Sequence, residues 1–259
     1  MSIEYVDVAT ARGAPGVRIV VSGLVPSPWS EAAKGLFRIA NVPALVVRRM
    51  FDGTEITAWT GADNVPVVLH NAEPARTHWA AITALAARLG GAGVVLPEDP
   101  EARVQTIGLV DEIAGEDGIG WNARIAMIDA SITSEGKRGF PVQVAHRLAQ
   151  RYGYGPDAAA RARIAITRQL QRMHDRLRDQ HARGHDYLGG ARPSALDVYL
   201  ATSLTPLSAI TPDDCPALDS RLRQAFGTAH EAFGELVSPA LWAHRTRMFQ
   251  RHLAWPIQL

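Results

Sequence analysis

The sequence predicts a two-part protein, a small α/β domain followed by an all-helical domain. Two β-branched runs with an amphipathic helix between them span Val17 to Val47. After a segment rich in glycine and proline, Gly90 to Val104, only helical patterns follow. One of these, between Pro193 and Pro212, carries a single charged residue, Asp197. A helix here has no polar face to turn to water, so we expect it at the centre of a helical bundle.

Length, charge and cysteine content narrow the class of protein. The 259 residues, 47% of them apolar, suffice for two modest domains. Lysine and arginine number 27 against 26 acids, so the charge balance gives no reason to expect nucleic acid or an anionic membrane as partner. The only thiol, Cys215, excludes an intrachain disulfide and a cysteine-based zinc site. Without an apolar signal segment or a membrane-length apolar run, a cytoplasmic location is expected.

The first elements follow from local patterns. We expect an irregular lead from Met1 to Gly16. The β-branched run from Val17 to Gly23 is bounded by turn residues and predicts a buried strand. Apolar residues recur at helical spacing from Trp29 to Ala40, and Ala44 to Val47 forms a second strand. Because the crossover between the two strands is a single short helix, the strands should be parallel.

A third strand and a second helix follow after a mixed segment. The run from Val65 to His70 predicts a strand, and Pro66 must lie at an edge, at the start of the strand or in a cis turn because proline cannot donate to a ladder. One apolar face from Trp79 to Leu89 predicts the helix. A fourth strand would have to come from Asn71 to Arg76, which has almost no β-forming residues.

Helical patterns fill the rest of the chain. They cover Ile107 to Ala114, Trp121 to Ile132, Val142 to Tyr152, an arginine-rich stretch around Ile166 to Leu177, and then Leu218 to Leu236 and Ala240 to His252. The buried helix begins with a capping box, in which Ser194 caps the first amides and Asp197 reaches back to the Ser194 N–H.

These features together resemble the cytosolic glutathione S-transferase family. The resemblance rests on the Ser-x-x-Asp helix within Leu188 to Thr202, the LPEDPEAR linker, the Val65-Pro66 step and the order of the first strands and helices. It implies a thioredoxin-like glutathione-binding domain over residues 1–91, with an extension at 1–16, a linker at 92–102 and an all-α C-terminal domain at 103–259. It also implies a homodimer, with the helices from Thr77 and from Arg103 facing the partner.

The implied reaction is activation of the glutathione thiol for attack on a hydrophobic electrophile between the domains. Ser27 or Ser30 would donate a hydrogen bond to the thiolate, at a helix N-terminus whose amides and dipole stabilise negative charge. A mechanism of disulfide exchange is excluded because no cysteine lies here. The alternative is structural, since Ser27 followed by Pro28 is an ordinary helix start.

The resemblance also places the glutathione-binding residues. Val65 and Pro66 resemble the Val-cis-Pro step whose backbone pairs with the cysteinyl part of glutathione, and Trp29 lies beside the thiol position. Thr77, His78 and Trp79 occupy the place where the family usually has Glu-Ser or Gln-Ser. Thr77 could cap this helix and leave amides for a carboxylate, whereas no acid is present for the γ-glutamyl ammonium unless Glu73 serves. For His78 the alternatives are a site residue poised for titration and, favoured over it, a solvated first-turn histidine.

A hydrophobic co-substrate pocket is expected where the domains meet. Trp121 would line it, with Asn122 and Arg124 as its polar groups, although helical spacing also makes the tryptophans core residues. No metal is expected, because the His181 and His185 pair lacks a further ligand. The rivals to a transferase are a non-catalytic protein of the same fold that binds a ligand or acts as a scaffold, and an enzyme using another anionic co-substrate.

Overall fold

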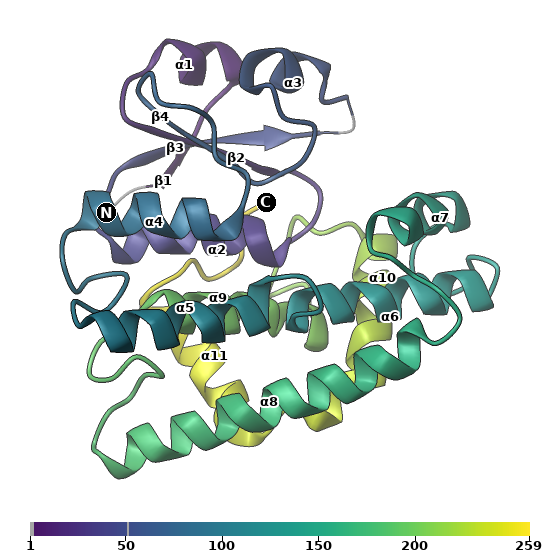
Figure 1. Ribbon diagram of the computed structural model, residues 1–259. Coiled ribbons are helices and arrows are strands. Elements are labelled where there is room, and N and C mark those ends of the chain that lie inside the picture. Colours follow the sequence, from purple (N-terminus) through teal and green to yellow (C-terminus); the bar gives the residue numbers. More distant parts are fainter. Residues whose placement is uncertain (1–2, 51) are drawn as a thin grey trace.

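The computed structural model describes residues 3–50 and 52–259. A four-stranded sheet with its own helices lies against a bundle of helices (Figure 1). The strands are β1 (Ile3–Tyr5), β2 (Val17–Ser22), β3 (Ala44–Arg49) and β4 (Val67–His70). The helices around the sheet are α1 (Val8–Gly13), α2 (Pro28–Ile39), α3 (Thr54–Thr60) and α4 (Trp79–Gly90). In Figure 1, α2 and α4 lie between the sheet and the bundle, and α1 and α3 cover the opposite face.

The sheet has the order β1-β3-β2-β4, in which only β4 runs antiparallel to its neighbour. The parallel pairing of β2 and β3, with Val17 opposite Ala44, confirms the expected strand–helix–strand unit. Side chains alternate between the faces of β2: Ile19 joins the large core with α2 and α4, and Val20 joins a smaller cluster toward α1 and α3. The thioredoxin-like character of this domain therefore follows from sheet order and helix placement.

Two sequence expectations for this domain need correction. The lead before β2 is not irregular, because Ile3–Tyr5 adds a parallel strand beside β3 and Asp7 caps α1 by accepting from the Thr10 N–H at 2.7 Å. A strand of three residues is too short to show a period in the sequence. The mixed segment before Val65 contains the helix α3. As the composition of Asn71 to Arg76 suggested, the fourth family strand is reduced to one bridge between Val68 and Arg76.

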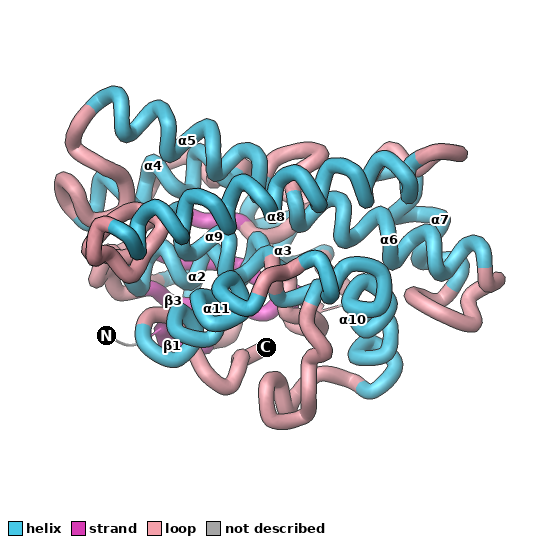
Figure 2. Tube along the Cα trace, turned by 90° about the horizontal axis from the view of Figure 1, so that it is seen from below, coloured by secondary structure: helices cyan, strands magenta, loops and turns pink. Residues whose placement is uncertain are grey.

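Seven α-helices follow in the described part of the chain: α5 (Pro100–Ala114), α6 (Ile119–Thr133), α7 (Val142–Arg151), α8 (Ala158–Ala182), α9 (Ala195–Ser203), α10 (Ser220–Phe233) and α11 (Pro239–Arg251). Single 3₁₀ turns lie at Thr205–Leu207 and Gly234–Leu236. Every residue of α9 is buried, and the helix contacts α2, α5 and α11. Figure 2 shows the bundle from below, with the magenta strands behind it. No helix of residues 3–50 and 52–259 is long and apolar enough to cross a membrane.

The predicted capping box at the start of α9 is confirmed. The carboxylate of Asp197 accepts hydrogen bonds from the Ser194 N–H and the Ser194 hydroxyl, both at 2.9 Å. It also accepts from the N–H groups of Leu188 at 2.7 Å and Gly189 at 3.3 Å. The polar side chain on this buried helix thus closes the loop before it.

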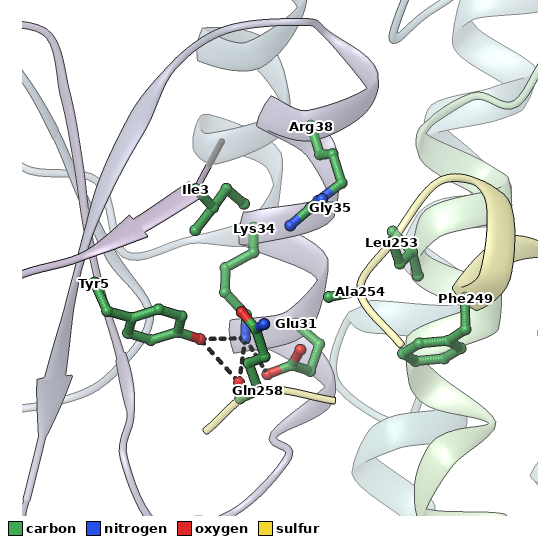
Figure 3. A pocket seen from close by; sticks show the side chains of 10 residues that line it. All are labelled: Ile3, Tyr5, Glu31, Lys34, Gly35, Arg38, Phe249, Leu253, Ala254 and Gln258. Atoms are coloured by element: carbon green, nitrogen blue, oxygen red, sulfur yellow. Dashed lines mark hydrogen bonds and ion pairs between the residues drawn. The ribbon is translucent and has the colours of Figure 1, made fainter. Parts of the chain in front are cut away.

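The segment after α11 returns to the sheet domain. The Lys34 ammonium donates to the Tyr5 hydroxyl at 2.9 Å and to the Gln258 carbonyl at 2.8 Å, and it pairs with Glu31 at 2.8 Å (Figure 3). Burial raises the pKa of Glu31, and the nearby Lys34 opposes that rise. This cluster connects β1, α2 and the C-terminal segment at Gln258. No local sequence pattern predicts it.

Candidate functional site

A cavity of about 360 Å³ opens between the sheet domain and the bundle. Its walls come from the turn before β4, the start of α4, the end of α5 and the segment from α6 to α7. We call it the aromatic cleft, because five rings of tryptophan and tyrosine line it: Trp29, Trp79, Trp121, Tyr152 and Tyr199. A concave site of this size with a few polar groups is typical of small-molecule binding.

The sheet-side wall is formed by the turn at Val65 and Pro66. The peptide bond between them is cis, as the Val-Pro step implied. The ladder between β2 and β4 begins at Val67, so the backbone of Val65 lies outside it, beside the cleft. Backbone groups outside a ladder are free to pair with an extended peptide ligand.

The start of α4 forms the next part of the wall. His78, not Thr77, is the N-cap, and its Nδ1 accepts from the Ala80 N–H at 3.2 Å. The expectation that Thr77 caps this helix is therefore wrong. Both residues are exposed and border the cleft. One of the free amides that a carboxylate ligand would use is already engaged by the His78 ring.

The aromatic side chains are held by specific contacts. The Trp29 indole donates to the Ala114 carbonyl at 2.7 Å, which joins the start of α2 to the end of α5. The rings of Trp121 and Tyr152 lie with their centroids 4.5 Å apart. The Tyr199 hydroxyl donates to the Trp79 carbonyl at 3.2 Å, and burial raises the pKa of Tyr199, so this phenol stays protonated. The cleft is thus lined by rings that are already positioned.

A tight turn joins α5 to α6 just before Trp121. A Cβ on Gly118 would come 2.6 Å from the Ile113 carbonyl oxygen, closer than real contacts allow. Only glycine fits this position, because the backbone of the preceding helix approaches it closely.

The two candidate serines lie outside the lining of the cleft, although Trp29 between them lines it. Ser30 is fully buried, and its Oγ accepts from the Ser22 N–H at 3.2 Å. Ser27 is 7% exposed and is the N-cap of α2, yet its side chain makes no hydrogen bond to the helix amides. The Ser30 hydroxyl is therefore engaged by the end of β2, whereas the Ser27 hydroxyl is not engaged by its helix.

The polar residues expected beside Trp121 also lie outside the cleft lining. Asn122 is 3% exposed and donates to the Asp117 carbonyl, and the Arg124 guanidinium lies 5.3 Å from the Phe140 ring centroid. Asn122 is rotated about 100° from Trp121 around α6, which turns it from the cleft, whereas Arg124 lies about one turn further along the helix with its guanidinium near the Phe140 and Phe226 rings. The charged groups that do line it, Glu116 and Arg151, carry no sequence signal that separates them from solvated residues.

Glu73 does not supply the missing acid. Its carboxylate accepts from Arg88 at 2.6 and 2.7 Å and pairs with His70 and Arg76. Hydrogen bonds from Arg88, then His70 and Arg76, lower the pKa of Glu73 to about 2. It belongs to a surface cluster beyond the lining of the cleft. Among the described residues there is also no group of three side chains suited to a metal ion.

Comparison with known proteins identifies the fold. No protein-family model matches the sequence, and no curated protein matches it either. Solved structures do match. A glutathione transferase family member from Pseudomonas fluorescens, with two glutathione bound, has a TM-score of 0.60 and 14% identity over 91% of this chain and 89% of that chain.

Two further matches come from bacterial glutathione S-transferases. The one from Methylobacillus flagellatus, with GSH bound, has a TM-score of 0.56 and 12% identity over 91% of this chain and 96% of that one. The one from Xanthobacter autotrophicus has a TM-score of 0.56 and 16% identity over 94% of this chain and 98% of that one. The chain therefore has the glutathione transferase fold, a thioredoxin-like domain followed by an all-helical domain.

Proposed function

We propose that this chain binds glutathione in the aromatic cleft and joins the glutathione sulfur to a hydrophobic electrophile. The observation that carries the proposal is the Val65-Pro66 wall, which lies outside the β2–β4 ladder and borders a cavity of about 360 Å³ lined by aromatic rings. Two proteins of the same fold, from Pseudomonas fluorescens and Methylobacillus flagellatus, hold glutathione in their structures. A thiol peptide paired with Val65 would leave the far side of the cleft to the second substrate.

Ser27 is the hydroxyl we assign to the thiol, since the Ser30 hydroxyl is engaged by Ser22. The thiol proton leaves to solvent, and the Ser27 O–H donates a hydrogen bond to the thiolate that remains. The sulfur electron pair then forms a bond to the electrophilic carbon, and the leaving group departs with its own bonding pair. Amides at the start of α2 favour the negative charge during this step.

The electrophile would bind against the Trp121 and Tyr152 rings, with Arg151 beside them. Partly exposed aromatic rings favour flat apolar substrates, and a guanidinium at the rim favours a substrate that carries an acidic or nitro group. Glutathione itself would present its γ-glutamyl carboxylate to the start of α4, at the amides that the His78 ring leaves free.

A second candidate function is ligand binding without thiol activation. It is favoured by the position of both serines outside the cleft lining and by the absence, among the described lining residues, of a carboxylate at the start of α4. Such a protein would bind a thiol peptide or an aromatic ligand and catalyse no transfer.

One experiment separates the two functions. Glutathione is titrated while tryptophan fluorescence reports on the cleft, and conjugation to an activated chloroarene is assayed in the wild type, Ser27→Ala and Ser30→Ala. S-methylglutathione, which lacks a nucleophilic thiol, serves as the control for binding. The transferase proposal expects quenching by both peptides and a loss of about a hundredfold in turnover for Ser27→Ala. Binding without turnover in the wild type establishes the second candidate, and no response at millimolar peptide rejects both the transferase and the binding of a thiol peptide.

We also propose a homodimer through α4 and α5. Two apolar side chains on α5 are solvent-exposed in the single chain, Val104 at 72% and Ile107 at 39%. Burying such residues against a second copy would remove apolar surface from water. Sedimentation of the wild type and of Val104→Asp tests this, with a dimer that dissociates in the variant as the expected result and a monomeric wild type as the contrary one.

A further inference from the structure

A second cavity, of about 350 Å³, lies where the two domains meet at the end of α2. Three arginines from distant parts of the chain line it: Arg38 at the end of α2, Arg192 in the loop before α9, and Arg251 at the end of α11. We call this cavity the arginine pocket. Arg38 and Leu253 also border the small space beside Lys34, which places the two cavities next to each other (Figure 3).

The charge of the arginine pocket is not balanced by its own walls. Its described lining holds three guanidinium groups and no carboxylate. Some other arginines of this chain pair with acids, as Arg172 does with Glu112 and Arg76 with Glu73. Within residues 3–50 and 52–259, no ion pair or hydrogen bond engages the guanidinium groups of the three pocket arginines. Because the whole chain carries a net charge of only +1, this local excess is not a general property of its surface.

The acid closest in sequence to Arg38 is already engaged. Glu31, two turns earlier on α2, is buried and forms an ion pair with Lys34 at 2.8 Å. It does not line the arginine pocket. Arg38 lowers the pKa of Glu31 from a distance, against the larger effect of burial, but no described carboxylate forms an ion pair with the Arg38 guanidinium.

Helix dipoles explain only part of this arrangement. Arg38 and Arg251 lie in the last turns of α2 and α11, where a cation is favourable whether or not a ligand binds. Arg192 lies two residues before Ser194, the N-cap of α9, where the helix end is positive and a cation is unfavourable. The Asp197 carboxylate at this helix start is bonded to Ser194, Leu188 and Gly189, and it does not pair with Arg192.

We propose that the arginine pocket binds a small oxyanion carrying two or more negative charges, a phosphoryl compound or a polycarboxylate. Guanidinium groups donate paired hydrogen bonds that match phosphate and carboxylate oxygens, and three of them suit a ligand of multiple charge. Ile39, Val94 and Leu253 add an apolar wall for the organic part of the ligand. This site is separate from the aromatic cleft and shares no lining residue with it.

Calorimetric titration at constant ionic strength tests the proposal. Pyrophosphate and citrate represent the phosphoryl and polycarboxylate ligands, and acetate is the singly charged comparison. Arg38→Gln, Arg192→Gln and Arg251→Gln are compared with Arg168→Gln, a matched change at an exposed arginine of α8 outside the pocket. We expect saturable binding of pyrophosphate or citrate that weakens about tenfold or more in each pocket variant and is unchanged in Arg168→Gln.

Two results would overturn the proposal. One is the absence of saturable binding by both polyanions, or equal binding of acetate. The other is loss of pyrophosphate or citrate binding when S-methylglutathione fills the aromatic cleft, since that would place the anion in the cleft. Should Arg38→Gln unfold, as judged by circular dichroism, the variants at the exposed Arg192 and Arg251 still decide the outcome.

Discussion

Helices α9 and α2 both have a serine as N-cap, and the two serines differ in their hydrogen-bond partners. At α9, Ser194 and Asp197 bond to each other, and Asp197 also accepts from the N–H groups of Leu188 and Gly189. At α2, Ser27 precedes a proline at the first helical position, and its side chain bonds to no helix amide. At the start of α9 the polar side chains are hydrogen-bonded within the protein, which we call a closed helix start. At the start of α2 the Ser27 side chain has no bond to a helix amide, which we call an open helix start.

The difference shows how structural and ligand-binding roles can be told apart at a helix N-terminus. A buried polar group that finds all its partners within the fold stabilises it, and it is not free for chemistry. A hydroxyl without such partners beside free amides remains available to an external anion. By this criterion Ser194 is structural; Ser30 is fully buried and accepts from the Ser22 N–H, and Ser27 is the serine of interest.

The largest expected effect comes from opening the closed helix start. Asp197→Ala removes a fully buried carboxylate that satisfies the amides of Leu188, Gly189 and Ser194. We expect a loss of about 3–5 kcal/mol in the free energy of unfolding, because buried donors are left without acceptors. Urea unfolding followed by circular dichroism measures it, with Asp197→Asn as the milder variant that keeps one acceptor oxygen. A loss below about 1 kcal/mol would contradict the structural role.

A smaller effect is expected at the buried serine of α2. Ser30→Ala leaves the Ser22 N–H at the end of β2 without its partner and should cost about 1–3 kcal/mol of unfolding free energy. Glutathione affinity should change little, since Ser30 does not line the cleft. The same urea experiment, paired with the fluorescence titration, checks both parts. A variant that is fully stable but no longer binds would show that Ser30 faces the ligand after all.

The closed helix start should also respond to pH through His244. The Nε2 of this buried ring lies 3.4 Å from Oδ1 of Asp197. Burial lowers the pKa of His244 below 6.5, and Asp197 opposes this shift. The positive charges of Arg247, His181 and His252 lower the pKa further. The unfolded chain then binds a proton at higher pH than the folded one, so stability falls as the pH drops below 6.5. We expect the wild type to lose up to about 1.4 kcal/mol per pH unit relative to His244→Gln.

Denaturant titrations of both proteins at several pH values between neutrality and mild acid would reveal this difference in slope. Parallel stability curves for the two proteins would mean that folding does not change the pKa of His244 and would contradict this prediction. A wild type that instead gains stability relative to His244→Gln as the pH falls would mean that protonated His244 forms a buried salt bridge with Asp197.

Local sequence patterns predicted those structural features that depend on residues close together in the chain. The Ser194 capping box and the cis bond at Pro66 were predictable because each rests on residue types a few positions apart. The three-residue strand β1 has no such signal, and the direction of Asn122 depends on a helix rotation that no spacing fixes. The arginine pocket gathers residues from three separate segments, so only the folded chain brings its charges together.

The smallest change in stability is expected at Ser27. Since the Ser27 side chain caps no helix amide, Ser27→Ala should alter the free energy of unfolding by no more than about 0.5 kcal/mol. An ordinary N-cap serine would lose about 1 kcal/mol on the same change, so urea unfolding of Ser27→Ala separates an open hydroxyl from a capping one. A loss of that size would assign Ser27 to the fold and remove the hydroxyl from the proposed reaction. A Ser27→Ala variant that remains stable but no longer conjugates glutathione would show that the Ser27 hydroxyl serves the thiolate and not the fold.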